Sequence, residues 1–181
     1  MILRFLVTII FLFNGIQYAQ EKTQANKETQ DSLSIKVGDK CPLYSTRDIE
    51  GNLFSVNNFS KSQVIILNFF ATWCVPCRGE LPALLDLVQK HKNDKLIVYL
   101  ISKGKDTRSE LLEFKTKEKL TDFIIIRDCY GMFSQKFGIN NIPVTLVLDQ
   151  KGNVREIFNG ADADFRIKLE KIITVILEEK R

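Results

Sequence analysis

The chain has 181 residues, 45% of them hydrophobic and 27% charged, and its formal net charge at pH 7 is +4. This length suits one well-buried domain and is short for two. Because basic residues alternate with acidic ones, no Lys/Arg stripe exists that could follow a phosphate backbone, and the composition argues against a nucleic-acid partner.

The N-terminal segment MILRFLVTIIFLF has one positive charge, Arg4, followed by an apolar stretch from Phe5 to Phe13 that only Thr8 interrupts. A positive charge, an apolar stretch and then polar residues are typical of a secretory signal peptide. The apolar stretch is also shorter than the roughly 20 apolar residues of a membrane-spanning helix. We expect a signal peptide at residues 1–19, cleaved after Ala19, with an uncleaved membrane anchor as the alternative. Either way, the protein is expected in the periplasm or elsewhere outside the cytoplasm, where thiols are readily oxidised.

Residues 20–36 are rich in Gln, Lys, Glu, Asn and Thr and have no periodic apolar face, which predicts a flexible polar linker. One domain is then expected over residues 37–181. Near its start, LYSTRDIEGNLFSV has two short strand-like runs around Glu50-Gly51-Asn52 and predicts an N-terminal β-hairpin.

The stretch from Gln63 to Phe70, QVIILNFF, is almost continuously apolar and predicts a strand that is covered on both faces of a parallel sheet. A helix is expected from about Val75 to Lys90, because apolar residues recur there at helical spacing. These residues are Leu81, Leu84, Leu85 and Val88.

Strand-like and helical segments then alternate: KLIVYLIS, DTRSELLEFKTK, DFIIIRD and YGMFSQKFG. This alternation predicts right-handed crossovers and a parallel core. Val144 to Leu148 and Val154 to Phe158 flank a turn-like segment and predict an antiparallel pair. The expected fold class is therefore α/β, with a central mixed sheet flanked by helices. The last helix should face the sheet with Phe165, Leu169, Ile172, Ile173 and Ile176.

The stretch ATWCVPCRGELP brings two of the chain's four cysteines, Cys74 and Cys77, to the start of the expected helix. A zinc site needs four ligands, and a copper site of thiolates and imidazole is equally short of partners, because the single histidine, His91, lies far along this helix. A structural disulfide across so short a loop would constrain the unfolded chain little. The pattern therefore favours a redox couple, without a metal or a cofactor.

Position assigns the two cysteines different roles. Free backbone N–H groups and the positive end of the helix dipole stabilise an anion at a helix N-terminus, so Cys74 is expected to be the attacking thiolate. Cys77, one turn on and facing inward, is expected to be the resolving thiol. Pro76 in the first turn favours helix initiation.

These residues resemble the thioredoxin superfamily, in which an apolar strand leads into W-C-x-P-C and a helix. Pro82 falls at the family's helix-kinking proline, and Ile142-Pro143-Val144-Thr145 resembles its cis-proline loop. The resemblance implies a thioredoxin-like fold over about Val37 to Leu177, with the hairpin as an N-terminal extension. It also implies that Pro143 is cis and packs against the disulfide, and that the backbone of Ile142 pairs with an extended substrate. The residues alone would favour a trans proline that starts a strand.

Thioredoxin has a buried aspartate where this chain has Asn68, and an amide cannot accept a proton at ordinary pH. Glu80 lies three residues after Cys77 on the same helical face, within reach directly or through a water. Asn68 with Glu80 is similar to the TlpA/ResA-like branch, which implies that Glu80 takes part in proton transfer at the site. The alternative is a solvated glutamate on an exposed turn. For Trp73, the resemblance implies a role in a substrate groove, and the alternative is a cap on the core.

Two cysteines lie outside the couple, Cys41 and Cys129. With Cys74 and Cys77 paired, a bridge from Cys41 to Cys129 is the only other one that the chain can form, and it would pin the N-terminal hairpin to the sheet. Two buried free thiols are the alternative, because the sequence does not give the distance between the two residues.

The expected function is that of an extracytoplasmic thiol-disulfide oxidoreductase that reduces disulfides in protein substrates. The resemblance implies a thiol electron donor in the membrane, and it fits apocytochrome c maturation and general disulfide repair equally well. A peroxiredoxin-like thiol peroxidase is an alternative, since V-G-D-K-C-P resembles its N-terminal segment, although no proline precedes Thr72. A copper chaperone is a non-enzymatic alternative.

Overall fold

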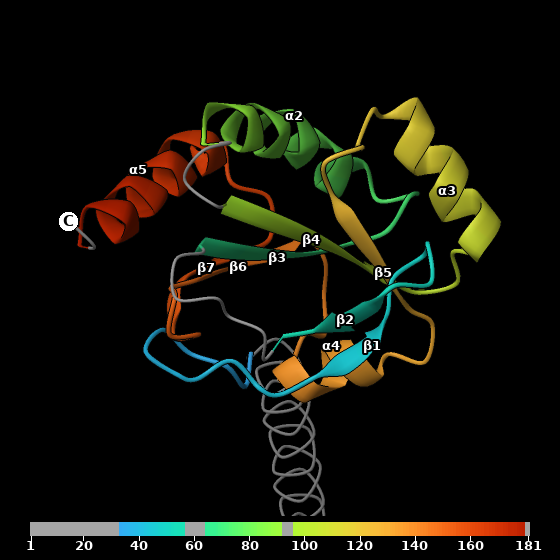
Figure 1. Ribbon diagram of the computed structural model, residues 1–181, viewed down its shortest axis with the longest axis horizontal. Coiled ribbons are helices and arrows are strands. Elements are labelled where there is room, and N and C mark those ends of the chain that lie inside the picture. Colours follow the sequence, from blue (N-terminus) through green and yellow to red (C-terminus); the bar gives the residue numbers. More distant parts are fainter. Residues whose placement is uncertain (1–32, 57–63, 92–95, 180–181) are drawn as a thin grey trace, which may run out of the picture. The chain divides into compact units, whose positions relative to one another are not determined.

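The computed structural model of the protein describes residues 33–56, 64–91 and 96–179 (Figure 1). The expected signal peptide, residues 1–19, and most of the expected linker lie outside these ranges. Among the described residues, no helix combines the length and the apolar character that crossing a membrane requires. Ile35, near the end of the expected linker, is buried, so packing already begins slightly before Val37.

A five-stranded mixed sheet with the order β5-β4-β3-β6-β7 forms the centre of the domain. The neighbouring pairs β3–β4 and β4–β5 are parallel and β6–β7 is antiparallel, as the sequence predicts. The antiparallel pairing of β6 with β3, which joins the two parts of the sheet, was not predicted. Every residue of β3 is buried, which agrees with its almost unbroken apolar run. The strands are β3 (Val64–Phe70), β4 (Leu96–Lys103), β5 (Ile124–Asp128), β6 (Val144–Leu148) and β7 (Val154–Asn159).

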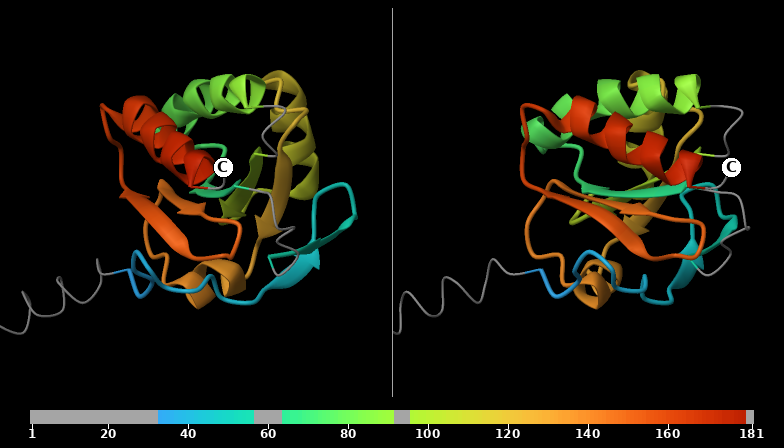
Figure 2. Two further views of the ribbon diagram at one scale, coloured as in Figure 1. Left: turned by 60° about the vertical axis from the view of Figure 1, so that its left-hand side comes forward. Right: turned by 90° about the vertical axis from the view of Figure 1, so that its left-hand side faces the viewer.

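Helices cover both faces of this sheet (Figures 1 and 2). One face carries α2 (Val75–Lys90), α3 (Arg108–Lys117) and α5 (Phe165–Glu178), and α2 has the predicted bounds. The short α4 (Met132–Phe137) lies on the opposite face. The expected hairpin is present as β1 (Ser45–Arg47) and β2 (Leu53–Ser55).

Two apolar cores hold these layers together. The core under α2, α3 and α5 consists mainly of aliphatic side chains and includes both Cys74 and Cys77. The core on the α4 side is rich in aromatic rings, where Tyr44 stacks on Phe133 with 4.2 Å between ring centroids and Phe69 meets Phe133 edge-on at 5.6 Å. Because β3 is packed from both sides, its carboxyl end is a rigid base for the cysteine pair.

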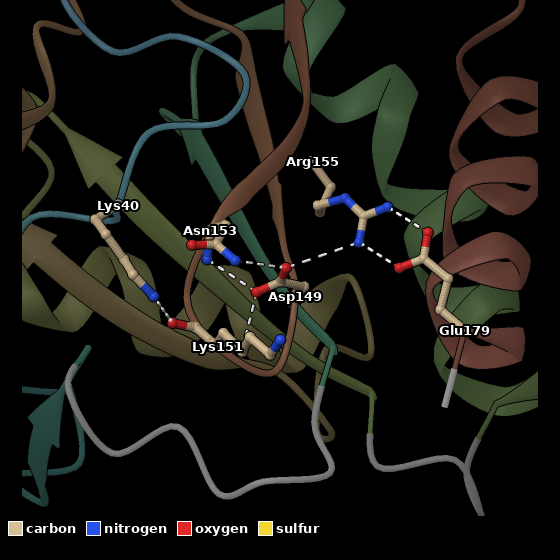
Figure 3. A network of polar contacts seen from close by, with 6 residues as sticks. All are labelled: Lys40, Asp149, Lys151, Asn153, Arg155 and Glu179. Carbon is tan, nitrogen blue, oxygen red and sulfur yellow. Dashed lines mark hydrogen bonds and ion pairs between the residues drawn. The ribbon is translucent and has the colours of Figure 1, made fainter. Parts of the chain in front are cut away.

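The turn between β6 and β7 is built around Asp149 (Figure 3). Its carboxylate accepts hydrogen bonds from the backbone of Lys151 and Asn153 and from the Asn153 side chain, while Gly152 adopts the left-handed conformation that glycine tolerates. Arg155 donates to both carboxylate oxygens of Glu179, at 2.7 and 2.6 Å, and so connects this turn to the end of α5. Such partly exposed pairs contribute little stability each, so the network mainly fixes the register of the hairpin.

The strand register brings distant segments to one edge of the sheet. Phe70 is paired with Ser102, and Lys103 with Asp128, so the carboxyl ends of the three parallel strands lie side by side. The antiparallel strand β6 starts at the same edge, since Val144 is paired with Phe69. The cysteine pair and the Pro143 loop therefore meet there.

Candidate active site

Cys74 and Cys77 form a disulfide where β3 gives way to α2, with 5.3 Å between their Cα atoms. Cys74 is the N-cap of α2, and its Sγ accepts a hydrogen bond from the Cys77 backbone N–H at 3.3 Å. Pro76 occupies the first turn, where a missing N–H leaves no gap in the helix. Cys74 is 5% exposed and Cys77 is fully buried, which agrees with an outer and an inner sulfur.

Glu80 lies one turn of α2 after Cys77 and is buried, with 6% of its surface exposed. The Asn68 Nδ2 group donates a hydrogen bond to Glu80 Oε2 at 2.9 Å, which links β3 to α2. Burial raises the pKa of Glu80 from 4.5 to about 7, although the hydrogen bond from Asn68 acts in the opposite direction. The interpretation of Glu80 as a solvated side chain is therefore wrong, because the turn of α2 that carries Glu80 packs against the sheet. A carboxyl with this pKa exchanges its proton near neutral pH.

Thr145 completes the polar group around Glu80. It lies opposite Asn68 in the antiparallel β3–β6 pair and is fully buried. Asn68 Nδ2 also donates to Thr145 Oγ1 at 2.8 Å, and Thr145 Oγ1 donates to Glu80 Oε2 at 3.5 Å. Thr145 is not among the site residues that the sequence predicts. The available signal was a single hydroxyl inside the apolar strand VTLVL, directly after the proline loop.

The Ile142–Pro143 peptide bond is cis, as the resemblance implies. Pro143 is buried, and its carbonyl accepts a hydrogen bond from Gly160 N at 2.9 Å. Trp73 is 68% exposed, so the alternative in which it caps the core is wrong. An indole directly before Cys74 that faces solvent offers an apolar surface next to the disulfide.

Asp106, in the loop after β4, holds the segment that leads into the cysteine pair. The sequence did not predict this role either. Its buried carboxylate accepts hydrogen bonds from the backbone N–H of Thr72 at 3.0 Å, from Thr72 Oγ1 at 2.7 Å and from Ser102 Oγ at 2.8 Å. Asp106 is 34 residues from Thr72, and only the β3–β4 pairing brings the two residues together. Such a contact between loops leaves no periodic pattern in the sequence.

The two remaining cysteines are not bridged. Cys41 is buried, and burial raises the pKa of its thiol to about 12, so it is unreactive at neutral pH. Cys129 is exposed in the turn after β5. The expectation of a Cys41–Cys129 bridge is thus wrong, and the alternative of two buried thiols holds for Cys41 alone. Within the described ranges, no three His, Cys, Asp or Glu side chains gather in a group that could hold a metal ion.

Comparison with known proteins agrees with this geometry. Residues 37–157 match the model of the AhpC/TSA family. The chain is 31% identical over 156 residues to thioredoxin-like protein YneN of Bacillus subtilis, covering 85% of this chain and 87% of that protein. It is 25% identical over 144 residues to the thiol-disulfide oxidoreductase ResA of Geobacillus thermodenitrificans, covering 78% and 81%. The crystal structure of StoA from Bacillus subtilis matches with a TM-score of 0.60 and 26% identity, covering 73% of this chain and 96% of that chain.

A thioredoxin-like fold with a disulfide at the N-terminus of its central helix defines a thiol-disulfide oxidoreductase. The chain belongs to the AhpC/TSA family. Its similarity to ResA confirms the expected resemblance to that branch of the thioredoxin superfamily.

Proposed function

We propose that this protein reduces disulfides in protein substrates outside the cytoplasm, with Cys74 and Cys77 as the redox couple. One observation carries the proposal: a sulfur at the cap of α2 is bonded to a fully buried sulfur that lies one turn before a buried carboxyl with a pKa near 7. This arrangement provides an attacking group, a resolving group and a proton acceptor within two turns of one helix.

In the reduced protein, the N-terminus of α2 stabilises Cys74 as a thiolate. Its sulfur attacks one sulfur of a substrate disulfide. A bond from Cys74 Sγ to the substrate forms as the substrate S–S bond breaks, and the second substrate sulfur leaves as a thiolate that takes a proton from water.

Cys77 then resolves the mixed disulfide. Its thiol gives a proton to the Glu80 carboxylate, and the resulting thiolate attacks Cys74 Sγ. The Cys74–Cys77 bond forms, and the remaining substrate sulfur leaves as a thiolate. Two electrons have moved to the substrate, and the protein is in the disulfide form of this structure.

Substrate is proposed to bind along Trp73 and the Pro143 loop. The exposed indole of Trp73 offers an apolar surface beside Cys74, and the backbone of Ile142 pairs with an extended segment of the substrate. Both groups lie at the edge of the sheet where the disulfide emerges. A protein with an accessible disulfide in an extended segment fits this surface.

A thiol donor in the membrane is proposed to return the couple to the dithiol, which balances the two electrons passed to the substrate. Residues 1–19 support a location outside the cytoplasm as a signal peptide, and if uncleaved they tether the protein to the membrane. Apocytochromes c and misoxidised proteins are both substrates of suitable chemistry.

The insulin reduction assay tests this function. With dithiothreitol as the donor, we expect the wild-type protein to accelerate precipitation of the insulin chains at least about tenfold over the uncatalysed reaction. C74S should remove the acceleration, and C77S should accumulate a mixed disulfide through Cys74 that mass spectrometry detects. C129S, which alters an exposed cysteine outside the couple, is the matched control and should match the wild type. Wild-type activity equal to background would overturn the proposal.

The same preparation tests the peroxidase alternative. A peroxidatic site uses a threonine hydroxyl to polarise the peroxide, but Thr72 Oγ1 donates its hydrogen bond to Asp106. We therefore expect slower consumption of hydrogen peroxide than of insulin disulfides, and the opposite order would favour a peroxidase. Tight Cu(I) binding without disulfide exchange would instead favour the copper chaperone.

A further inference from the structure

Lys103, the last residue of β4, points toward the loop that precedes Pro143. Its Nζ donates hydrogen bonds to the carbonyl oxygens of Ile139, at 2.9 Å, and of Asn140. These two residues directly follow the end of α4 and lead into the cis peptide bond between Ile142 and Pro143. One side chain of the sheet thus supplies the donor for two consecutive carbonyl groups.

The surroundings of Lys103 suit the positive charge of its own ammonium group. The side chain is half-buried, and its strand partner in β5 is the buried carboxylate of Asp128. Burial lowers the pKa of Lys103, and the negative charge of Asp128 acts against this change. A charged donor forms stronger hydrogen bonds to carbonyl groups than a neutral one does, so this contact can fix a loop that has no regular secondary structure.

The same loop has its other end fixed. Pro143 leads into β6, and its carbonyl accepts from Gly160 N. Gly138, at the start of the loop, caps α4 in the left-handed conformation. Between these anchors, the Ile139 side chain is buried and its N–H donates to Ser134 O at 2.8 Å. Lys103 adds the hydrogen bonds to the carbonyl groups of Ile139 and Asn140.

We propose that Lys103 is a positioning residue for polypeptide substrates, which holds the segment from Ile139 to Ile142 in the position that accepts an extended chain. This inference rests on the proposed function, because it assumes that substrate pairs with the loop before Pro143. A small disulfide needs access to Cys74 only, whereas a polypeptide also needs the loop. Loss of the Lys103 contact should therefore raise the KM for a protein disulfide more than it affects a small disulfide.

The experiment compares two substrates, insulin and the small aromatic disulfide 5,5′-dithiobis(2-nitrobenzoate), with the full-length protein. We expect K103M to lower the ratio of kcat/KM for insulin to kcat/KM for the small disulfide by about five- to tenfold, mainly through the KM for insulin. K103R retains the charge and the donors and should restore most of this ratio. K105M, which changes an exposed lysine in the loop after β4, is the matched control and should keep the wild-type ratio.

A ratio in K103M within twofold of the wild type would overturn the inference, and so would a loss in K103R as large as that in K103M. If K103M does not fold, K103Q, whose donor is carried one bond closer to the backbone, should lower the ratio in the same way, and an unchanged ratio would again contradict the role. Failure of the wild-type protein to reduce insulin would instead contradict the proposed function, so the two failures can be told apart.

Discussion

At the scale of single residues, the proposed mechanism depends on one buried carboxyl, that of Glu80. Asn68 and Thr145 hold Glu80 Oε2 from two strands, but neither residue is charged, so burial dominates and the pKa of Glu80 rises to about 7. Thioredoxin-like sites need a group that takes the proton of the inner cysteine. In the proposed mechanism that group is Glu80 on the helix, and the two strands supply the hydrogen bonds that orient it.

Replacing Glu80 by glutamine tests its proton-transfer role. We expect E80Q to slow the release of substrate from the mixed disulfide by about 10- to 100-fold at neutral pH, because Cys77 then loses its proton acceptor. The wild-type rate should rise with pH through about 7, and this inflection should be absent in E80Q. Stopped-flow measurement between pH 5 and 9 checks both, with E113Q on the exposed face of α3 as the control. The same inflection in E80Q as in the wild type would exclude this role for Glu80.

The raised pKa also has a consequence for stability. Glu80 has a higher pKa in the folded protein than its ordinary value of 4.5, so folding takes up a proton between about pH 4.5 and 7. The free energy of unfolding therefore falls as the pH rises through this window. Above the window, the folded protein contains the buried negative charge of Glu80. The uncharged glutamine avoids this cost.

We therefore expect oxidised E80Q to unfold with a free energy about 2 kcal/mol higher than the wild type at pH 8, and with nearly the same free energy at pH 4. Urea titrations at the two pH values measure the difference. An equal difference at pH 4 and pH 8 would mean that ionisation of Glu80 is not its cause.

At the scale of elements, the loop after β4 supports the approach to α2. Asp106 accepts both the backbone N–H and the hydroxyl of Thr72, two residues before Cys74, and so sets where β3 ends and the helix begins. The contact joins two loops that the parallel pairing of β3 and β4 places together. A carboxylate suits this position because all three of its hydrogen-bond partners are donors.

Replacing Asp106 by asparagine should lower the free energy of unfolding by about 1 to 3 kcal/mol, since an amide presents N–H groups to a site that holds donors. Insulin reduction should also slow, because Trp73 and Cys74 directly follow Thr72 and are no longer held in position through it. D122N, at an exposed aspartate, is the matched control. Unfolding free energies that are the same for D106N and D122N would show that the contact is not stabilising.

The elements were largely predictable from the sequence. The apolar run of β3 and the helical spacing in α2 identify the main strand and helix, and the bounds of α2 agree with the structure. The W-C-x-P-C motif locates the disulfide. Periodicity and local motifs report on neighbours along the chain, and these features depend on such neighbours.

Contacts across the sheet were not predictable in the same way. Thr145 and Asp106 meet their partners through strand pairing. Thr145 stands out only as a hydroxyl in an apolar strand, and nothing in the local sequence of Asp106 distinguishes it from ordinary polar residues. The separation of Cys41 from Cys129 is likewise a property of the tertiary fold, and counting cysteines does not reveal it.

At the scale of the whole molecule, the fold gathers the outer cysteine, the inner cysteine with its carboxyl, and the Pro143 loop at one edge of the sheet. A mixed sheet allows this, because the parallel strands end where the antiparallel β6 begins. The same arrangement is compatible with a reductant and with an oxidant of protein disulfides. The direction of electron flow therefore depends on the relative stability of the dithiol and the disulfide.

The reduction potential of the Cys74/Cys77 couple tests the proposed reductase most directly. Equilibration of the protein with dithiothreitol or glutathione buffers, followed by thiol alkylation and mass spectrometry, gives its value. The account predicts a potential near the roughly −270 mV of thioredoxin, at which the dithiol reduces ordinary protein disulfides. A value near the roughly −120 mV of the oxidant DsbA would contradict it, because such a couple donates its disulfide to substrates.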